Sequence, residues 1–207
     1  MTEYRTIEKE AAAEFVERRS RFIGYAKPVS SENEAVSFIN EIKARHWNAS
    51  HNVYAYCIRE GQIKRYSDDG EPQGTAGIPT LDVLLKSNLT DLAVVVTRYF
   101  GGVLLGAGGL VRAYSRSCSI AVEQAGIIAM RTCVMAQVSC DYSQYGRLSA
   151  LIPENDGVID GTDFTDRVTI LFHIGDDKIP DLSKKLSDAT CGRSNISVTG
   201  EKYFKFI

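Results

Sequence analysis

The sequence lacks the features that would place it in a membrane or outside the cell. No apolar run approaches the roughly 20 residues of a membrane-spanning helix, and the first five residues lack a signal peptide's apolar core. Its five cysteines include no close pair of the kind that binds zinc. We therefore expect a cytoplasmic protein with no membrane partner and no metal. We also expect buried, reduced thiols at Cys57, Cys118, Cys133, Cys140 and Cys191.

The chain also lacks a large excess of one charge. Its 207 residues carry 24 Lys and Arg against 26 Asp and Glu, a formal net charge of −2. Through Ile127 there are 15 basic and 15 acidic residues, and after it 9 and 11. Neither half is the basic block expected of a protein that grips phosphate backbones without specificity. The charge balance still permits a local basic patch.

Histidine is scarce, and no hydrolytic motif is complete. The three histidines occur without H-E-x-x-H, and no G-x-S-x-G is present. His46 and His51 could bind a metal or transfer protons, but no cysteine or third histidine lies nearby in sequence. A hydrogen-bonded structural role is the better interpretation for both. We assign no catalytic residue and no cofactor.

Glycine, by contrast, is concentrated in one stretch. Eight of the 17 glycines lie between Gly70 and Gly109, which is unusual because glycine weakens regular elements. Known phosphate loops do not match: Gly101 to Gly106 has P-loop spacing without the following Lys-Ser/Thr, and Val111 replaces the last glycine of a dinucleotide pattern. Two interpretations stay open. Loop amides at a helix N-terminus could bind an anion, or the glycines could only make sharp turns and tight packing.

An acidic loop opens the same stretch. Asp68, Asp69 and Glu71 could hold Mg²⁺ or serve acid–base chemistry, or they could cap turns and accept backbone amides. Arg98 could pair with one of them. We predict that the three acids converge with Arg98, the glycine loop and the start of the following helix, where Arg112 adds positive charge. The candidate ligand- or partner-binding residues are His51, Asp68, Asp69, Glu71, Thr75, Arg98, Tyr99, Gly101, Gly102, Gly106, Gly108, Gly109 and Arg112.

Hydrophobic periodicity predicts the elements of the first 127 residues. A capping box at Ser31–Glu34 begins a helix that ends near Trp47. Arg18, Arg19 and Arg21 could touch an acidic partner, but a solvated turn is preferred. The remaining strands are predicted over 6–15, 22–28, 51–59, 62–66 and 92–97, and the remaining helices around 79–85 and over 110–125.

After Gly126 the pattern restarts. A strand is predicted over 131–140 and a helix over 142–152, followed by a hairpin of 158–164 and 167–174. A second helix from Ile179 stops at Gly192, and the last strand covers 196–204. This βαββαβ order is that of a ferredoxin-like unit. We therefore expect two α/β domains, 1–127 and 128–207, that pack together.

Several motifs together carry a family resemblance. They are Asp68-Asp69-Gly70-Glu71-Pro72, Gly74-Thr75-Ala76-Gly77, Thr97-Arg98-Tyr99-Phe100-Gly101-Gly102, Leu105-Gly106 and Gly108-Gly109-Leu110, with Ser20-Arg21-Phe22-Ile23 and Ala49-Ser50-His51-Asn52-Val53-Tyr54-Ala55 upstream. Their order resembles the YigZ/IMPACT family. The motifs cover about the first 125 residues, and the rest resembles the C-terminal domain of bacterial members by element order.

The resemblance implies a two-layer α/β (α+β) first domain, like the second domain of a small-subunit ribosomal protein and domain four of elongation factor G. It implies a ferredoxin-like second domain similar to another elongation-factor domain. The resemblance therefore implies a non-catalytic binding or regulatory protein whose partner is RNA, the ribosome or a translation factor. The alternative is an enzyme that acts on a phosphorylated small molecule through the acidic and glycine-rich loops. Eukaryotic members carry an added N-terminal domain and regulate translation by competing for a stress-kinase activator. We do not transfer that role, and no oligomeric state is predicted.

Overall fold

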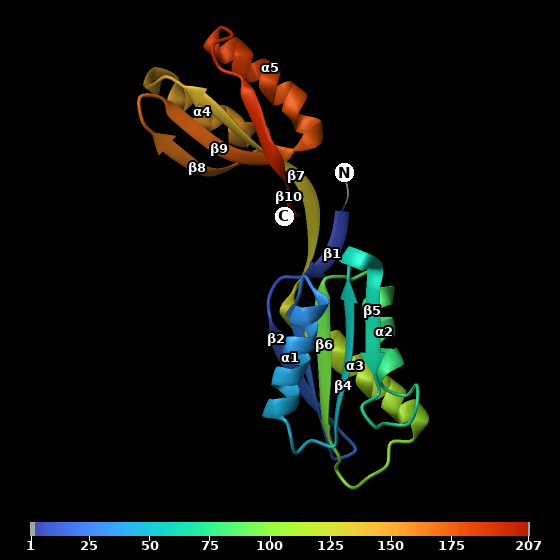
Figure 1. Cartoon of the computed structure of the whole chain (residues 1–207). Helices are drawn as coiled ribbons and strands as arrows, with labels where there is room; N and C mark the ends of the chain where they lie inside the picture. The colour runs from blue at the N-terminus through green and yellow to red at the C-terminus, as the bar shows by residue number, and fades with distance from the viewer. Residues whose placement is uncertain (1–2, 207) are drawn as a thin grey trace. The chain divides into compact units, whose positions relative to one another are not determined.

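The computed structural model describes residues 3–206 and divides them into two compact units (Figure 1). The first unit is Tyr4–Ala129, and the second is Met130–Phe206 with Glu3. Five α-helices and ten strands form mixed α/β units within these residues, with short 3₁₀ turns at Glu60–Gln62 and Asp176–Lys178. No described helix has the length and apolar character needed to cross a membrane.

The sheet of the first unit is antiparallel and has the order β2-β3-β6-β4-β5. Its strands are β2 (Ala11–Glu17), β3 (Ser20–Pro28), β4 (His51–Ile58), β5 (Ile63–Ser67) and β6 (Leu92–Tyr99). The predicted strand over 6–15 is wrong in one respect. It is interrupted at Glu8–Glu10, where a bend separates β1 (Glu3–Ile7) from β2.

Strand β6 is central because nearly all of it is apolar. Leu92 to Arg98 are buried, and their side chains alternate between two hydrophobic clusters. Leu92, Val94 and Val96 join one cluster, while Ala93 and Val95 join the other. A strand whose two faces are both covered has such a near-continuous apolar run.

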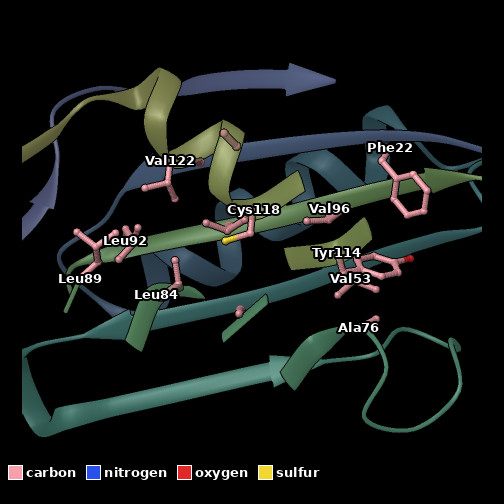
Figure 2. Packing of buried hydrophobic residues seen from close by; sticks show 14 of the residues in the cluster. Phe22, Val53, Ala76, Leu84, Leu89, Leu92, Val96, Tyr114, Cys118 and Val122 are labelled. Atoms are coloured by element: carbon pink, nitrogen blue, oxygen red, sulfur yellow. The ribbon is translucent and has the colours of Figure 1, made fainter. Parts of the chain in front are cut away.

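Helices cover both faces of this sheet. Helix α1 (Glu32–Arg45) buries Phe38, Ile39 and Ile42 on one face, and its N-cap Ser31 accepts from the Glu34 amide. Helices α2 (Gly77–Lys86) and α3 (Ala107–Ala125) cover the other face. Figure 2 shows Tyr114 of α3 near Phe22, Cys118 near Val96, and Val122 at the other end of the cluster near Leu92. Helix α1 thus adds a third layer to the two that were expected.

The second unit has the predicted βαββαβ order. Its elements are β7 (Ile127–Cys140), α4 (Tyr142–Glu154), β8 (Val158–Phe164), β9 (Val168–Gly175), α5 (Ile179–Thr190) and β10 (Ile196–Phe206). The strand order is β1-β7-β9-β8, with β10 also on β7, so β10-β7-β9-β8 is the ferredoxin-like order. Leu148 and Ile152 of α4 and Leu182 and Leu186 of α5 pack on its core. Helix α5 stops at Cys191, one residue before Gly192, with φ 53°.

The cysteines are free thiols, but they are not all buried. Cys57, Cys118 and Cys140 are buried, Cys133 is half-buried and Cys191 is exposed. The expectation of five buried thiols is therefore wrong for Cys191. Its position at the left-handed end of α5 holds it in solvent.

Candidate functional site

Three loops meet at the end of the first unit where β6 ends (Figure 1). They are the β2–β3 turn of Arg18 and Arg19, the α1–β4 loop 46–50, and the β6–α3 loop 100–106. The Ser50 amide donates to the Arg98 carbonyl (2.9 Å), and the Phe100 amide donates to Ser50 Oγ (3.0 Å). Arg18 Nη1 reaches the Leu104 carbonyl at 3.5 Å. The acidic loop between β5 and α2 adjoins the same end.

Asp68 holds its own loop in shape. One carboxylate oxygen accepts the Gly74 amide at 2.9 Å. The other accepts the amides of Ala76 (3.1 Å) and Gly77 (2.8 Å), which are orphan donors at the start of α2. Thr75 serves the same loop, because its hydroxyl donates to the Pro72 carbonyl at 2.7 Å.

Asp69 ties the loop to α1 and β4. Its Oδ1 lies 2.6 Å from Lys43 Nζ, and its Oδ2 accepts the Asn52 amide at 2.7 Å. Its backbone has φ 46°, and its carbonyl bonds His51 Nδ1 at 2.9 Å. His51 Nε2 lies 3.8 Å from Glu71 Oε1. His51 is thus hydrogen-bonded to the backbone of the acidic loop.

Glu71 forms a buried network with Arg98 and Tyr114. Arg98 Nη1 lies 2.5 Å from Glu71 Oε1, and the Tyr114 hydroxyl donates to the same oxygen at 2.7 Å. Arg98 Nη2 lies 3.4 Å from Ser20 Oγ, while its Nε is buried without a hydrogen-bond partner in the described part of the chain. Burial and then the Glu71 charge raise the pKa of Tyr114, so the phenol keeps its proton and donates.

The three acids therefore do not converge on one arginine. Only Glu71 pairs with Arg98, whereas Asp68 binds backbone amides and Asp69 binds Lys43. Each carboxylate is already engaged in fixing a loop. Within residues 3–206, no group of three or more His, Cys, Asp and Glu side chains is arranged to hold a metal ion.

The glycines separate into close-packed and open ones. A Cβ on Gly101 would lie 2.0 Å from the carbonyl carbon and oxygen of Arg19, so the glycine lets two loops touch. Gly102 and Gly106 have φ of 81° and 72° with open space around them. Gly108 and Gly109 lie in the first turn of α3. The helix begins at Ala107, three residues before its predicted start at Leu110. Close packing therefore explains Gly101, and positive φ explains Gly102 and Gly106.

Tyr99 belongs to a small network around His46. The two ring nitrogens of His46 bond the hydroxyls of Tyr25 (2.6 Å) and Tyr99 (2.9 Å), and Tyr99 also reaches Asn48 Oδ1 at 3.3 Å. Burial, then the charges of Arg45 and Arg21, lower the pKa of His46. The network joins the α1–β4 loop to the end of β6.

A cavity of about 240 Å³ lies between β2, the β2–β3 turn and the start of α3. Arg112 is one of its residues, but the acidic loop is not. The cavity is lined by Phe15, Glu17, Arg18, Leu105, Gly109, Arg112, Ala113 and Arg116. The sequence analysis missed Arg116, and it left Arg18 as a solvated turn residue. Arg112 and Arg116 are four residues apart on one helix face, which was the available signal.

Large apolar side chains are exposed on two of the three loops, the α1–β4 loop and the β6–α3 loop. Trp47 is 83% exposed, Phe100 48% and Leu104 79%. Sequence analysis did not select them, because an apolar residue in a loop gives no sign of whether it is covered. Their neighbours on the turn, Arg18 and Arg19, are exposed as well.

Comparisons with known proteins match both units. The Impact N-terminal domain family matches residues 18–122, and a domain of unknown function, DUF1949, matches residues 138–193. The chain is 39% identical over 194 residues to the IMPACT family member YvyE of Bacillus subtilis, covering 93% of this chain and 89% of that protein. It is 33% identical over 178 residues to the IMPACT family member YigZ of Escherichia coli, covering 84% and 87%.

Two further similarities concern the eukaryotic proteins and the fold. The Protein IMPACT homolog of Dictyostelium discoideum is 37% identical over 95 residues, 44% of this chain and 27% of that protein. A crystal structure described as that of a hypothetical protein is similar with a TM-score of 0.61 and 30% identity. That similarity covers 96% of this chain and 98% of the other.

Proposed function

We propose, from the premise that this chain belongs to the IMPACT family, that it is a non-catalytic, cytoplasmic binding protein of the translation apparatus whose ligand is RNA. The binding surface is the end of the first unit formed by the β2–β3 turn, the α1–β4 loop and the β6–α3 loop. We call this surface the loop end.

The observation that supports the proposal is the composition of the loop end. Arg18 and Arg19 project there, and none of the three loops contains Asp or Glu. Two acids of the neighbouring loop are already paired with cations, Asp69 with Lys43 and Glu71 with Arg98, while Asp68 accepts backbone amides of its own loop. A chain of near-neutral total charge thus carries a local basic surface.

Exposed rings accompany these cations. Trp47 and Phe100 are on adjacent loops, since Ser50 of the first loop bonds the backbone of the second. Proteins that bind single-stranded nucleic acid combine a basic surface with aromatic side chains on which bases stack. The loop end has both, which favours an RNA strand over a purely ionic partner.

The alternative of an enzyme acting through the acidic loop has less support. Asp68, Asp69 and Glu71 each accept hydrogen bonds that fix the backbone or a buried arginine. A general acid or base must reach the proton that it transfers. Using any of these carboxylates would first break the loop that carries it.

Trp47 provides the test, because it is the one tryptophan of the chain. Titration with single-stranded RNA is expected to quench its fluorescence, and the apparent affinity should fall as salt rises. Arg18→Ala/Arg19→Ala should weaken binding and make its salt dependence shallower. Lys86→Ala is the matched control: Lys86 is 81% exposed but ends α2, before the start of β6 rather than near its end.

The same variants can be followed in a lysate. Ribosome sedimentation and pull-downs, with and without RNase, should show an RNA-dependent association that the double arginine variant loses. If RNA leaves Trp47 fluorescence unchanged and the double variant associates like the parent protein, the loop end is not the RNA-binding surface.

A further inference from the structure

The cavity beside the loop end has an unusual lining for its size. Three arginines, Arg18, Arg112 and Arg116, line a volume of about 240 Å³, with Glu17 as the acidic residue of the lining. Phe15 forms an apolar wall. Small-molecule pockets typically occupy about 300–1,000 Å³, so this cavity suits a small group at the end of a larger ligand.

We propose that this cavity binds a phosphate monoester, the terminal phosphate of an RNA strand. The proposal rests on the proposed function and adds a specific part of the ligand to it. In this proposal the loop end binds the body of the RNA strand, and the cavity binds its terminal phosphate.

Charge favours a terminal phosphate over an internal one. Three arginines less one glutamate leave a local charge of two positive units in the lining. A phosphate monoester carries about −1.5 to −2 at neutral pH, whereas each phosphate within a strand carries a single negative charge. The monoester therefore matches the cavity, and an internal phosphodiester leaves part of the positive charge uncompensated.

Arg112 lies where its positive charge is unfavourable unless an anion is bound nearby. Its Nη1 would lie 3.6 Å from a Cβ at Gly108, so the guanidinium is beside the first turn of α3. That turn contains no acidic residue, and the helix N-terminus is itself positive. A bound dianion would remove this repulsion.

The start of α3 also contains backbone donors. The first bond within α3 runs from the Leu110 amide to the Gly106 carbonyl, so the amides of residues 107–109 have no partner inside the helix. Gly109 lines the cavity. Such amides add hydrogen bonds for phosphate oxygens to those of the arginines.

The arginines are partly held in place before any ligand arrives. The Arg116 guanidinium lies 4.5 Å from the centroid of the Phe15 ring, and Arg18 Nη1 reaches the Leu104 carbonyl. Planar guanidinium groups bind phosphate through paired hydrogen bonds, and orienting them in advance lowers the entropic cost of binding.

The test compares one RNA sequence with a 5′-phosphate, with a 3′-phosphate and with two hydroxyl ends. The strand with the phosphate at the recognised end is expected to bind at least about tenfold more tightly than the hydroxyl strand. Arg112→Ala should abolish this preference while the affinity for the hydroxyl strand changes little. Arg19→Ala is the control, because Arg19 is beside Arg18 on the β2–β3 turn but does not line the cavity. In this variant the phosphorylated and hydroxyl strands should both bind more weakly, and the preference for the phosphorylated strand should persist.

The outcomes separate the two proposals. Equal binding of all three strands overturns the phosphate site and leaves RNA binding intact. If no strand binds, AMP and adenosine decide the point on their own, through the NMR signals of Gly109 and the Arg112 side chain. Saturable shifts with AMP support the site for a free nucleotide if adenosine gives none and the Arg112→Ala variant shows none. The absence of any shift with AMP overturns the site.

Discussion

Arg98 and Glu71, 27 residues apart in the chain, meet as an ion pair inside the first unit rather than on its surface. Their side chains are 6% and 3% exposed. A pair this deeply buried fixes the end of β6 against the acidic loop. The pair therefore supports the loop end from inside the unit, whereas Arg18 and Arg19 are exposed on it.

Removing Arg98 is expected to destabilise the protein strongly. Arg98→Ala leaves the Glu71 carboxylate buried without its cation, a change that costs about 3–5 kcal/mol. Arg112→Ala removes an exposed charge and should alter stability by no more than about 0.5 kcal/mol. Denaturant unfolding of both variants measures the difference. An Arg98→Ala protein as stable as the parent would show that the network is dispensable.

Two glycine substitutions should have opposite effects. Gly101→Ala forces a Cβ to within 2.0 Å of the Arg19 carbonyl and is expected to cost about 1–3 kcal/mol or more through backbone displacement. Gly108→Ala meets only ordinary contact inside a helix and should stabilise by up to about 1 kcal/mol. Thermal melting compares them. Equal melting temperatures would mean that the contact between the two loops adapts without cost.

His46 should make stability depend on pH. Its pKa is lowered in the folded state, by burial and by Arg45 and Arg21, from the ordinary value of 6.5. Below about pH 6.5 the imidazole of His46 therefore binds a proton more readily in the unfolded chain than in the folded protein. Stability contributed by neutral His46 is complete above that pH, falls as pH drops, and levels off below the folded pKa.

An NMR titration of the His46 ring measures this pKa directly. Arg45→Ala is expected to raise it towards the ordinary value, and His46→Gln should flatten the loss of stability between pH 7 and pH 5. A folded pKa above that of an unfolded peptide would contradict the account.

Thiol chemistry should rank the cysteines by exposure. Cys191 is expected to react first with a thiol reagent, because it is the exposed cysteine. Burial raises the pKa of Cys57 to about 11, so this thiol holds few thiolate ions at neutral pH. Cys57 and Cys118 should react only on unfolding. Cys191→Ser should remove the fast phase, and a fast phase that persists would identify another accessible thiol.

Local patterns predicted most of the elements. The strand predicted over 92–97 and the helix predicted over 110–125 both correspond to elements with buried faces in the structure. The break between β1 and β2 was missed, because no glycine or proline marks the bend at Glu8–Glu10.

The site was harder to predict than the fold. The pairing of Arg98 with an acid was anticipated, but which acid it meets depends on loop geometry that composition does not carry. Asp68 reaches amides six to nine residues ahead, and Asp69 reaches Lys43 on α1. The cavity combines a β-turn with a helix more than 90 residues later, and only the three-dimensional fold brings Arg18 beside Arg112.

The turn of Arg18 and Arg19 carries a further implication. Ser20 pairs with Glu17, so these two residues alone connect β2 and β3, and both have positive φ, 45° and 67°. Asn-Gly is the favoured sequence for such a turn, since left-handed backbone costs other residues energy. An Asn-Gly replacement would thus relieve strain while deleting both cations. If the loop end binds RNA as proposed, stability and ligand affinity make opposite demands on these two positions, and the sequence present is the one that favours affinity.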